Sequence, residues 1–125
     1  MRSLLPALAA LQFLNGLLML LTPQFWYGAV PGVTETGPFN VHFVRDTGLG
    51  FLSAGFALWL AAIYPLSARL LVTLASVFLV GHALLHLAEI AMHGRELGHI
   101  ARDLALIVVP ALLPLMIFAR RRGHA

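Results

Sequence analysis

A stripe of ionisable side chains runs along residues 81–93, GHALLHLAEIAMH, within a segment that is otherwise apolar. His82, His86, Glu89 and His93 follow one another at spacings of four, three and four residues. Residues three and four apart are neighbours on an α-helix, so these side chains share one face. Ionisable groups are costly inside a membrane, where they usually face a bundle interior or a water-filled cavity. The stripe is therefore the leading candidate for a functional site.

Three kinds of chemistry could use this stripe. His82 and His86 can bind one ion from a single helix face, which makes haem and a divalent metal the candidate cofactors. A b-type haem would also need a histidine from a facing helix. Imidazoles could instead carry protons or bind a solute, because they titrate near neutral pH. Finally, the side chains could hydrogen-bond helices together, since the chain also carries small residues that let helices approach closely, namely Gly16, Gly48, Gly50, Gly55 and Gly81.

The composition is that of a polytopic membrane protein. Of the 125 residues, 60% are hydrophobic and only 10% are charged, whereas a soluble domain carries about 25% charged residues. The chain has no cysteine, which excludes disulfides and thiolate metal sites. The basic residues lie at the ends of apolar runs, where membrane topology explains them. We therefore expect the lipid bilayer, and no nucleic acid, as a partner.

Four apolar runs reach the roughly 17 to 25 residues that a membrane-spanning helix needs. They cover approximately residues 4–21, 47–64, 70–92 and 104–119. Residues 22–40 are rich in glycine and proline and should be mainly loop. The connections at 65–69 and 94–98 are short, which favours antiparallel neighbours, and Ser67 should cap the third helix. The sequence predicts one all-α membrane domain, an up-down four-helix bundle.

The charges at the ends of the predicted spans indicate an orientation. One side carries only basic residues, namely Arg2, Arg69, Arg120, Arg121 and Arg122. The opposite side mixes three arginines with four acidic residues, namely Arg45, Arg95 and Arg102 with Glu35, Asp46, Glu96 and Asp103. Because positive charge is retained in the cytoplasm, both termini should be cytoplasmic, as in a multi-pass protein of a bacterial inner membrane.

Two short segments share the pattern H-x-x-R-D, residues 42–46 and residues 99–103. Each lies where an even-numbered span would enter the membrane from the outer side. The chain could therefore consist of two repeated helical hairpins related by an axis along the membrane normal. The alternatives are a chance match or a pair of interfacial anchors, in which arginine reaches the headgroups.

We expect both H-x-x-R-D segments to converge on the stripe and form a pocket in the outer half of the bundle. At 1.5 Å per residue, His82 would lie near the midplane and His93 near the outer interface. The predicted pocket comprises His42, Arg45, Asp46, His82, His86, Glu89, His93, His99, Arg102 and Asp103.

The chain as a whole resembles the small four-span bacterial inner-membrane proteins of the DoxX-like type. The resemblance lies in size, in the spacing of the spans and in the Arg45-Asp46 and Arg102-Asp103 pairs that open two of them. It implies an inner-membrane location and a four-span fold, but no catalytic residue. The imidazoles of the third span have no counterpart in this resemblance.

The leading functional hypothesis is a non-enzymatic membrane protein, either a subunit of a larger assembly or a small binding protein that uses the pocket. Its partner would be another membrane protein or further copies of the chain. The alternative hypothesis is a metal- or haem-dependent membrane redox enzyme, with His82 and His86 as ligands and Glu89 as a proton acceptor. A proton or solute transporter is the third.

Overall fold

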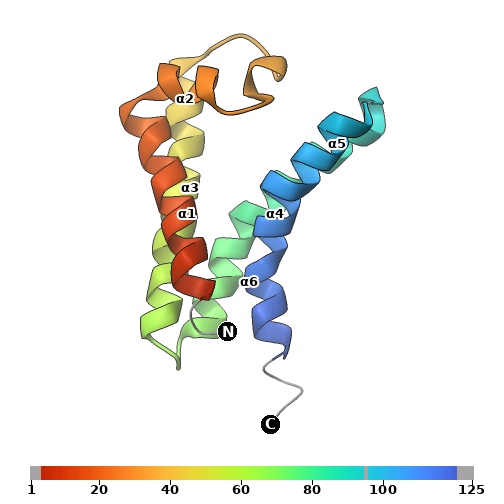
Figure 1. Ribbon diagram of the computed structural model, residues 1–125. Helices are drawn as coiled ribbons and strands as arrows, with labels where there is room; N and C mark the ends of the chain where they lie inside the picture. The colour runs from red at the N-terminus through yellow and green to blue at the C-terminus, as the bar shows by residue number, and fades with distance from the viewer. Residues whose placement is uncertain (1–3, 95, 121–125) are drawn as a thin grey trace.

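The computed structural model describes residues 4–94 and 96–120, and over this range the chain is all-helical (Figure 1). Three long helices are α1 (Leu4–Leu21), α3 (Val41–Ile63) and α4 (Ala68–His93). A fourth runs from α5 (Leu97–Asp103) through the π-helical segment η2 (Leu104–Val108) into α6 (Val109–Arg120). All four are long and apolar enough to cross a membrane. Four of the arginines discussed above, Arg2, Arg95, Arg121 and Arg122, lie outside the described residues.

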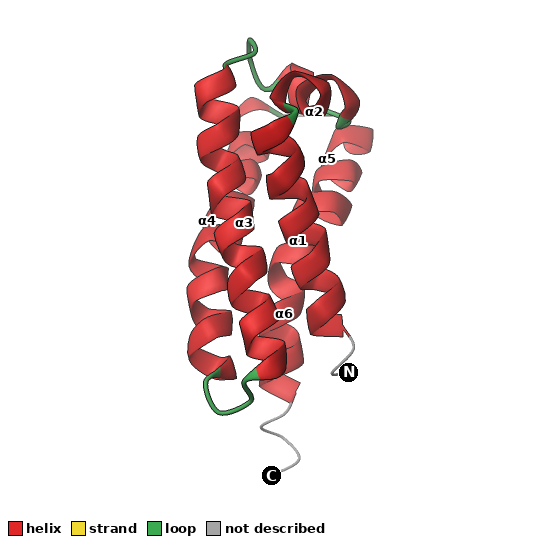
Figure 2. Ribbon diagram, turned by 90° about the vertical axis from the view of Figure 1, so that its left-hand side faces the viewer, coloured by secondary structure: helices red, strands yellow, loops and turns green. Residues whose placement is uncertain are grey.

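The connections gather at two opposite ends of the molecule (Figures 1 and 2). One end, here the turn end, carries residues 64–67 between α3 and α4, the start of α1 and the end of α6. The opposite end, here the strap end, carries α2 (Pro23–Ala29), η1 (Val33–Glu35) and the turn between α4 and α5. Towards the strap end, α4 and α5 lean away from α1 and α3 (Figure 1).

Helices α1 and α3 pack with their backbones almost in contact. A Cβ atom on Gly16 would lie 2.6 Å from the carbonyl oxygen of Gly48, and one on Gly55 would lie 2.7 Å from the amide nitrogen of Phe13. Any side chain there would push the helices apart, so glycine is what permits this approach. The prediction of close helix approach is confirmed at these residues and is wrong at Gly81, where nothing lies within 4 Å of the Cβ position.

The apolar core lies mainly towards the turn end. Its largest fully buried side chains include Leu5 of α1, Leu58 of α3, Val72 of α4 and Pro114 of α6. Helix α4 is attached to α3 partly through Gly50, against which the ring of Phe78 packs. Burial of these side chains holds the four long helices together at this end, because closely packed side chains gain van der Waals attraction from many atomic contacts.

Two local predictions are wrong in part. Residues 22–40 are not simply loop, because Pro23 starts the short helix α2, a position that suits proline. Ser67 makes no side-chain hydrogen bond to the start of α4, since its backbone is already helical (φ −96°, ψ −2°) rather than extended. Asn40 does cap α3, accepting hydrogen bonds from the amides of His42 and Phe43, so that helix begins well before residue 47.

The π-helical segment η2 lies between the buried Asp103 and a proline. The amide of Val109 donates to the carbonyl of Leu104, five residues back. Pro110 has no amide proton to continue the α-helical ladder, which favours such a local change of register. Residues five apart lie on one side of a π turn, and Asp103 and Val108 are both buried accordingly.

Candidate functional site

Six ionisable residues form one chain of contacts where α4 and α5 diverge from the rest of the molecule. We call them the polar cluster: Glu35, His82, His86, His99, Arg102 and Asp103. Arg102 is its centre. Its Nε donates to Asp103 Oδ1 at 3.0 Å, and its two terminal nitrogens donate to the Glu35 carboxylate at 3.3 and 3.4 Å.

Each of the two carboxylates also lies beside an imidazole. His86 Nδ1 is 3.8 Å from Asp103 Oδ2, and His99 Nδ1 is 3.8 Å from Glu35 Oε2. The first pair is the more enclosed: the Asp103 side chain is 8% exposed and that of His86 is 20% exposed. The side chains of Glu35 and His99 are both 41% exposed. The cluster therefore runs from an accessible pair to an enclosed one.

His82 connects the enclosed pair to an aromatic wall. Its ring packs edge-on against His86, with centroids 4.9 Å apart. On its other sides it stacks on Phe78 and meets the edge of Phe51, at centroid distances of 5.9 and 5.3 Å. Beyond His82, the contacts of the cluster are therefore apolar.

Residues 30–37, here called the strap, cover Arg102. Gly32 has a left-handed backbone (φ +85°), and a Cβ atom there would collide with the Arg102 guanidinium. The far end of the strap is fixed because the Tyr27 hydroxyl donates to the carbonyl of Gly37 at 2.6 Å. Helix α2 is in turn tied to α1, since Trp26 Nε1 donates to Asn15 Oδ1 at 2.7 Å. The strap thus bridges α1 and α5.

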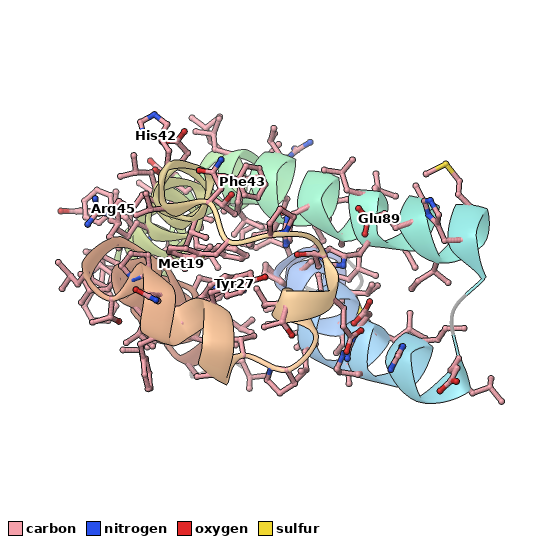
Figure 3. The ribbon with its side chains drawn as sticks, turned by 90° about the horizontal axis from the view of Figure 1, so that it is seen from above. Met19, Tyr27, His42, Phe43, Arg45 and Glu89 are labelled. Atoms are coloured by element: carbon pink, nitrogen blue, oxygen red, sulfur yellow. The ribbon has the colours of Figure 1, made fainter. Side chains whose placement is uncertain are left out.

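The first H-x-x-R-D segment lies outside the cluster, which corrects the expectation of a single pocket. Among residues 4–94 and 96–120, His42 and Asp46 pair with each other, at 4.0 Å, and with no other ionisable side chain; their side chains are 90% and 66% exposed. Arg45 is exposed and donates from Nε to the carbonyl of Leu20 at 3.2 Å. Seen from above, His42 and Arg45 lie at one edge of the molecule, far from Glu89 on α4 (Figure 3).

The packing of α3 explains this separation. Val44 and Gly48 are buried on the side of α3 that carries the contact with α1. At 3.6 residues per turn, His42 and Asp46 point to the opposite side. The H-x-x-R-D spacing determines that the histidine, arginine and aspartate side chains lie near one another on the helix. It does not determine whether that face of the helix packs against another helix.

Two members of the predicted stripe contribute differently from His82 and His86. His93 is exposed, and its Nδ1 lies 3.2 Å from the backbone oxygen of Glu89 on its own helix. Glu89 is partly buried on α4, one helical turn from His86. His82 and His86 are therefore the members of the stripe whose described contacts define the polar cluster.

Sequence reasoning missed Glu35. It is the only charged residue between positions 22 and 40, and a single charge in an otherwise uncharged connection is a usable signal. Which cation it meets is set by the path of the strap, which the sequence alone does not reveal. Without Glu35, Arg102 and His99 would be understood only as anchors at the membrane surface.

His82 and His86 do not by themselves make a metal or haem site. Among the described residues, no group of three or more His, Cys, Asp or Glu side chains is placed to hold an ion, whereas a protein site usually supplies at least three ligands. His82 and His86 lie one turn apart on the same helix with their rings in contact. A haem held by two imidazoles needs them on opposite faces of the ring, so His82 and His86 cannot both bind one haem, and a second ligand would have to come from a facing helix.

Comparisons with protein-family models, curated proteins and solved structures found no match for this chain. The DoxX-like resemblance therefore stays a prediction from size and span spacing. Functional argument has to come from the geometry of the polar cluster and from its place in the fold.

Proposed function

We propose that this chain is a small, non-enzymatic integral membrane protein of a bacterial inner membrane, built as an up-down bundle. The observation that supports it is the division of the molecule. Four long apolar helices could each cross the bilayer, while the contacts among ionised side chains gather at one end. Large apolar side chains such as Leu66, Val77 and Leu85 are exposed, and lipid tails would cover those within the bilayer.

The strap end faces away from the cytoplasm in this proposal, and both termini are cytoplasmic. Arg69 lies in the first turn of α4 at the turn end, and the C-terminal arginines begin with Arg120 at the end of α6. The acidic residues Glu35, Glu96 and Asp103 belong to the strap end. A positive excess on one side is the usual mark of the cytoplasmic side.

The polar cluster is the site at which the protein binds its ligand or partner. Ionisable groups inside a membrane are costly and are retained where they bind, carry or recognise something. Here Arg102 is held by two carboxylates, and the strap positions one of them from a distant part of the chain. This arrangement orders the side chains in advance, which lowers the entropic cost of binding.

Membrane insertion and orientation can be tested by cysteine labelling, because the chain has no cysteine of its own. Thr34→Cys places a thiol on the exposed strap, and Ser67→Cys places one on the exposed turn at the opposite end. In intact cells, a membrane-impermeant maleimide should label position 34 and should reach position 67 only after permeabilisation. Equal labelling of both positions in intact cells would contradict the proposal.

The binding role can be tested on protein purified in mild detergent. We expect a partner or ligand whose retention is reduced by His86→Gln and unaffected by the matched change His42→Gln on the exposed segment. A Soret band or a stoichiometric metal would favour the redox enzyme instead. A partner retained equally by both variants would point to an assembly subunit that does not use the cluster.

A further inference from the structure

The guanidinium of Arg102 is held on one side by the fold and meets the strap on the other. Its Nε donates to Asp103 Oδ1 at 3.0 Å, and the Asp103 side chain is 8% exposed, so the orientation of the guanidinium is fixed from within. The two terminal nitrogens donate to the two oxygens of the Glu35 carboxylate. Two N–H groups side by side match the two oxygens of a planar carboxylate. Arg102 therefore presents a pre-oriented carboxylate-binding edge.

The contact between Arg102 and Glu35 is long. The two nitrogen–oxygen distances are 3.3 and 3.4 Å, whereas hydrogen bonds between charged nitrogen and oxygen groups are about 2.7 to 2.9 Å. The Arg102 side chain is 19% exposed and that of Glu35 is 41% exposed. Because water screens a partly exposed pair, this contact adds little stability. A carboxylate from outside the chain can therefore compete with Glu35 for Arg102.

An imidazole lies beside the same carboxylate. His99 Nδ1 is 3.8 Å from Glu35 Oε2. His99 precedes Arg102 by three residues on α5, so the two side chains share one face of that helix. A neutral imidazole donates one hydrogen bond, so His99 can add a third contact to a carboxylate bound at Arg102. A carboxylate in the place of Glu35 would have both of these partners.

The strap carries its own local structure. Three amides within residues 33–36 donate to carbonyls three residues back, so these hydrogen bonds lie inside the turn. Gly32 and Gly37 flank the turn at φ +85° and +141°. Glycine adopts positive and negative φ about equally readily, so both positions can change backbone angle at low cost. The turn that carries Glu35 can therefore move away from Arg102 as a unit.

Charge indicates which acid fits the site. Exchanging one carboxylate for another leaves the charge of the polar cluster unchanged, whatever the other groups nearby carry. A phosphate monoester carries about −1.5 to −2 charges near neutral pH, and would add negative charge close to the buried Asp103. Added charge is costly where water is scarce. The site therefore favours a singly charged carboxylate over a phosphate monoester.

We propose that the outer edge of Arg102, with His99 beside it, binds a carboxylate ligand, and that Glu35 occupies this place when the ligand is absent. The carboxylate of the ligand binds the two terminal nitrogens of Arg102, and the strap moves outward with Glu35. The inference rests on the binding role proposed above for the polar cluster and names the class of its ligand. A small acid in the water and a fatty acid in the membrane both offer this group.

The test uses the full chain, in mild detergent for a water-borne acid and in lipid nanodiscs for a membrane-borne one. Acetate replaces chloride at constant ionic strength up to about 0.5 M, above the roughly millimolar effective concentration of a flexibly tethered group. In nanodiscs, palmitate is compared with its uncharged methyl ester. Amide hydrogen exchange in residues 30–37 reports the release of the strap.

We expect exchange in residues 30–37 to be up to about fivefold faster with the carboxylate than with its control, the factor by which a partly exposed ion pair shifts an equilibrium. A response to acetate identifies the water as the source of the ligand, and a response to palmitate alone identifies the membrane. Equal exchange with both acids and their controls would overturn the proposal.

Two variants that each remove one carboxylate separate competition from a general effect of charge. Glu35→Gln frees the edge of Arg102, so acetate should bind about fivefold more tightly, because the apparent Kd no longer includes occupation by the strap. Glu96→Gln removes the same charge from an exposed position before α5 and should leave the affinity unchanged. Saturation transfer from the protein to the acetate methyl protons measures both. Equal affinities in the two variants would contradict the proposal.

A second pair of variants tests the arginine. Arg102→Gln should abolish acetate binding, and Arg45→Gln, in the exposed segment, should not. If Arg102→Gln does not fold, the comparison of Glu35→Gln with Glu96→Gln decides, since both positions are exposed. If His86→Gln reduces the retention of a ligand while Glu35→Gln leaves acetate binding unchanged, the polar cluster binds something other than a carboxylate. If neither variant has an effect, the proposed binding role fails as well.

Discussion

The two H-x-x-R-D segments have the same pattern and different surroundings. In residues 42–46 the histidine and aspartate are exposed and lie 4.0 Å apart, the one ion pair that either makes within the described part of the chain. In residues 99–103 the arginine is bound by two carboxylates, one of them 67 positions away in the sequence. The same local spacing therefore produces a surface pair in one case and the centre of a polar cluster in the other. What differs is the partner that each segment meets.

The difference between the segments comes from the helices that carry them. Helix α3 turns Val44 and Gly48 towards α1, which leaves the first segment on the outside. In the second segment, Asp103 is buried at the end of α5, and the strap supplies Glu35. Variants made at equivalent positions of both segments measure the difference directly.

The largest contrast should come from the two aspartates. Asp103→Ala removes the enclosed carboxylate that contacts both Arg102 and His86, and we expect a loss of about 2 kcal/mol in unfolding free energy. Asp46→Ala removes an exposed side chain and should cost less than about 0.5 kcal/mol. Unfolding in mixed detergent and dodecyl sulfate micelles measures both values. Similar losses for the two variants would contradict the contrast.

The next effect concerns the strap. Gly32→Ala combines a left-handed backbone with a collision against Arg102, and should cost about 2 kcal/mol. Gly37→Ala also has a positive φ but nothing within 4 Å of its Cβ position, so it should lose less, about 1 kcal/mol. Gly28→Ala, in open space on α2, should be neutral. If Gly32 and Gly37 gave equal losses, the contact with Arg102 would be absent.

A smaller effect is expected for the carboxylate of the strap. Glu35→Gln weakens its contacts with Arg102 and His99, both partly exposed, and should cost about 1 kcal/mol or less. Its clearer consequence is dynamic, since amide hydrogens of residues 30–37 should exchange faster. Glu96→Gln, exposed before α5, is the control and should leave this exchange unchanged. Unaltered exchange in Glu35→Gln would mean that the ion pair does not fasten the strap.

The smallest effect should be at Arg45. Its Nε donates to the carbonyl of Leu20 near the end of α1, and the side chain is exposed. Arg45→Gln should therefore cost less than about 0.5 kcal/mol in the same unfolding measurement. A loss of several kcal/mol would show that the first segment also has an enclosed partner.

Much of the helical content and part of the candidate site follow from the sequence. Long apolar runs predict the long helices, and the spacing of His82 and His86 predicts that their rings are neighbours, because both depend on local geometry. The orientation of His42 and the partner of Arg102 could not be predicted. They depend on which face of α3 meets α1 and on the path of the strap, which are set by contacts between distant residues such as Gly16 and Gly48.

The most direct test of the account is a double-mutant cycle between Glu35 and Arg102. Single and double changes to glutamine should show a coupling of about 0.5 to 1 kcal/mol in unfolding free energy, as expected for a partly exposed ion pair. The same cycle between Glu35 and Arg45 should show none beyond experimental error. Equal coupling in both cycles, or none in the first, would contradict the claim that the strap is joined to the second H-x-x-R-D segment.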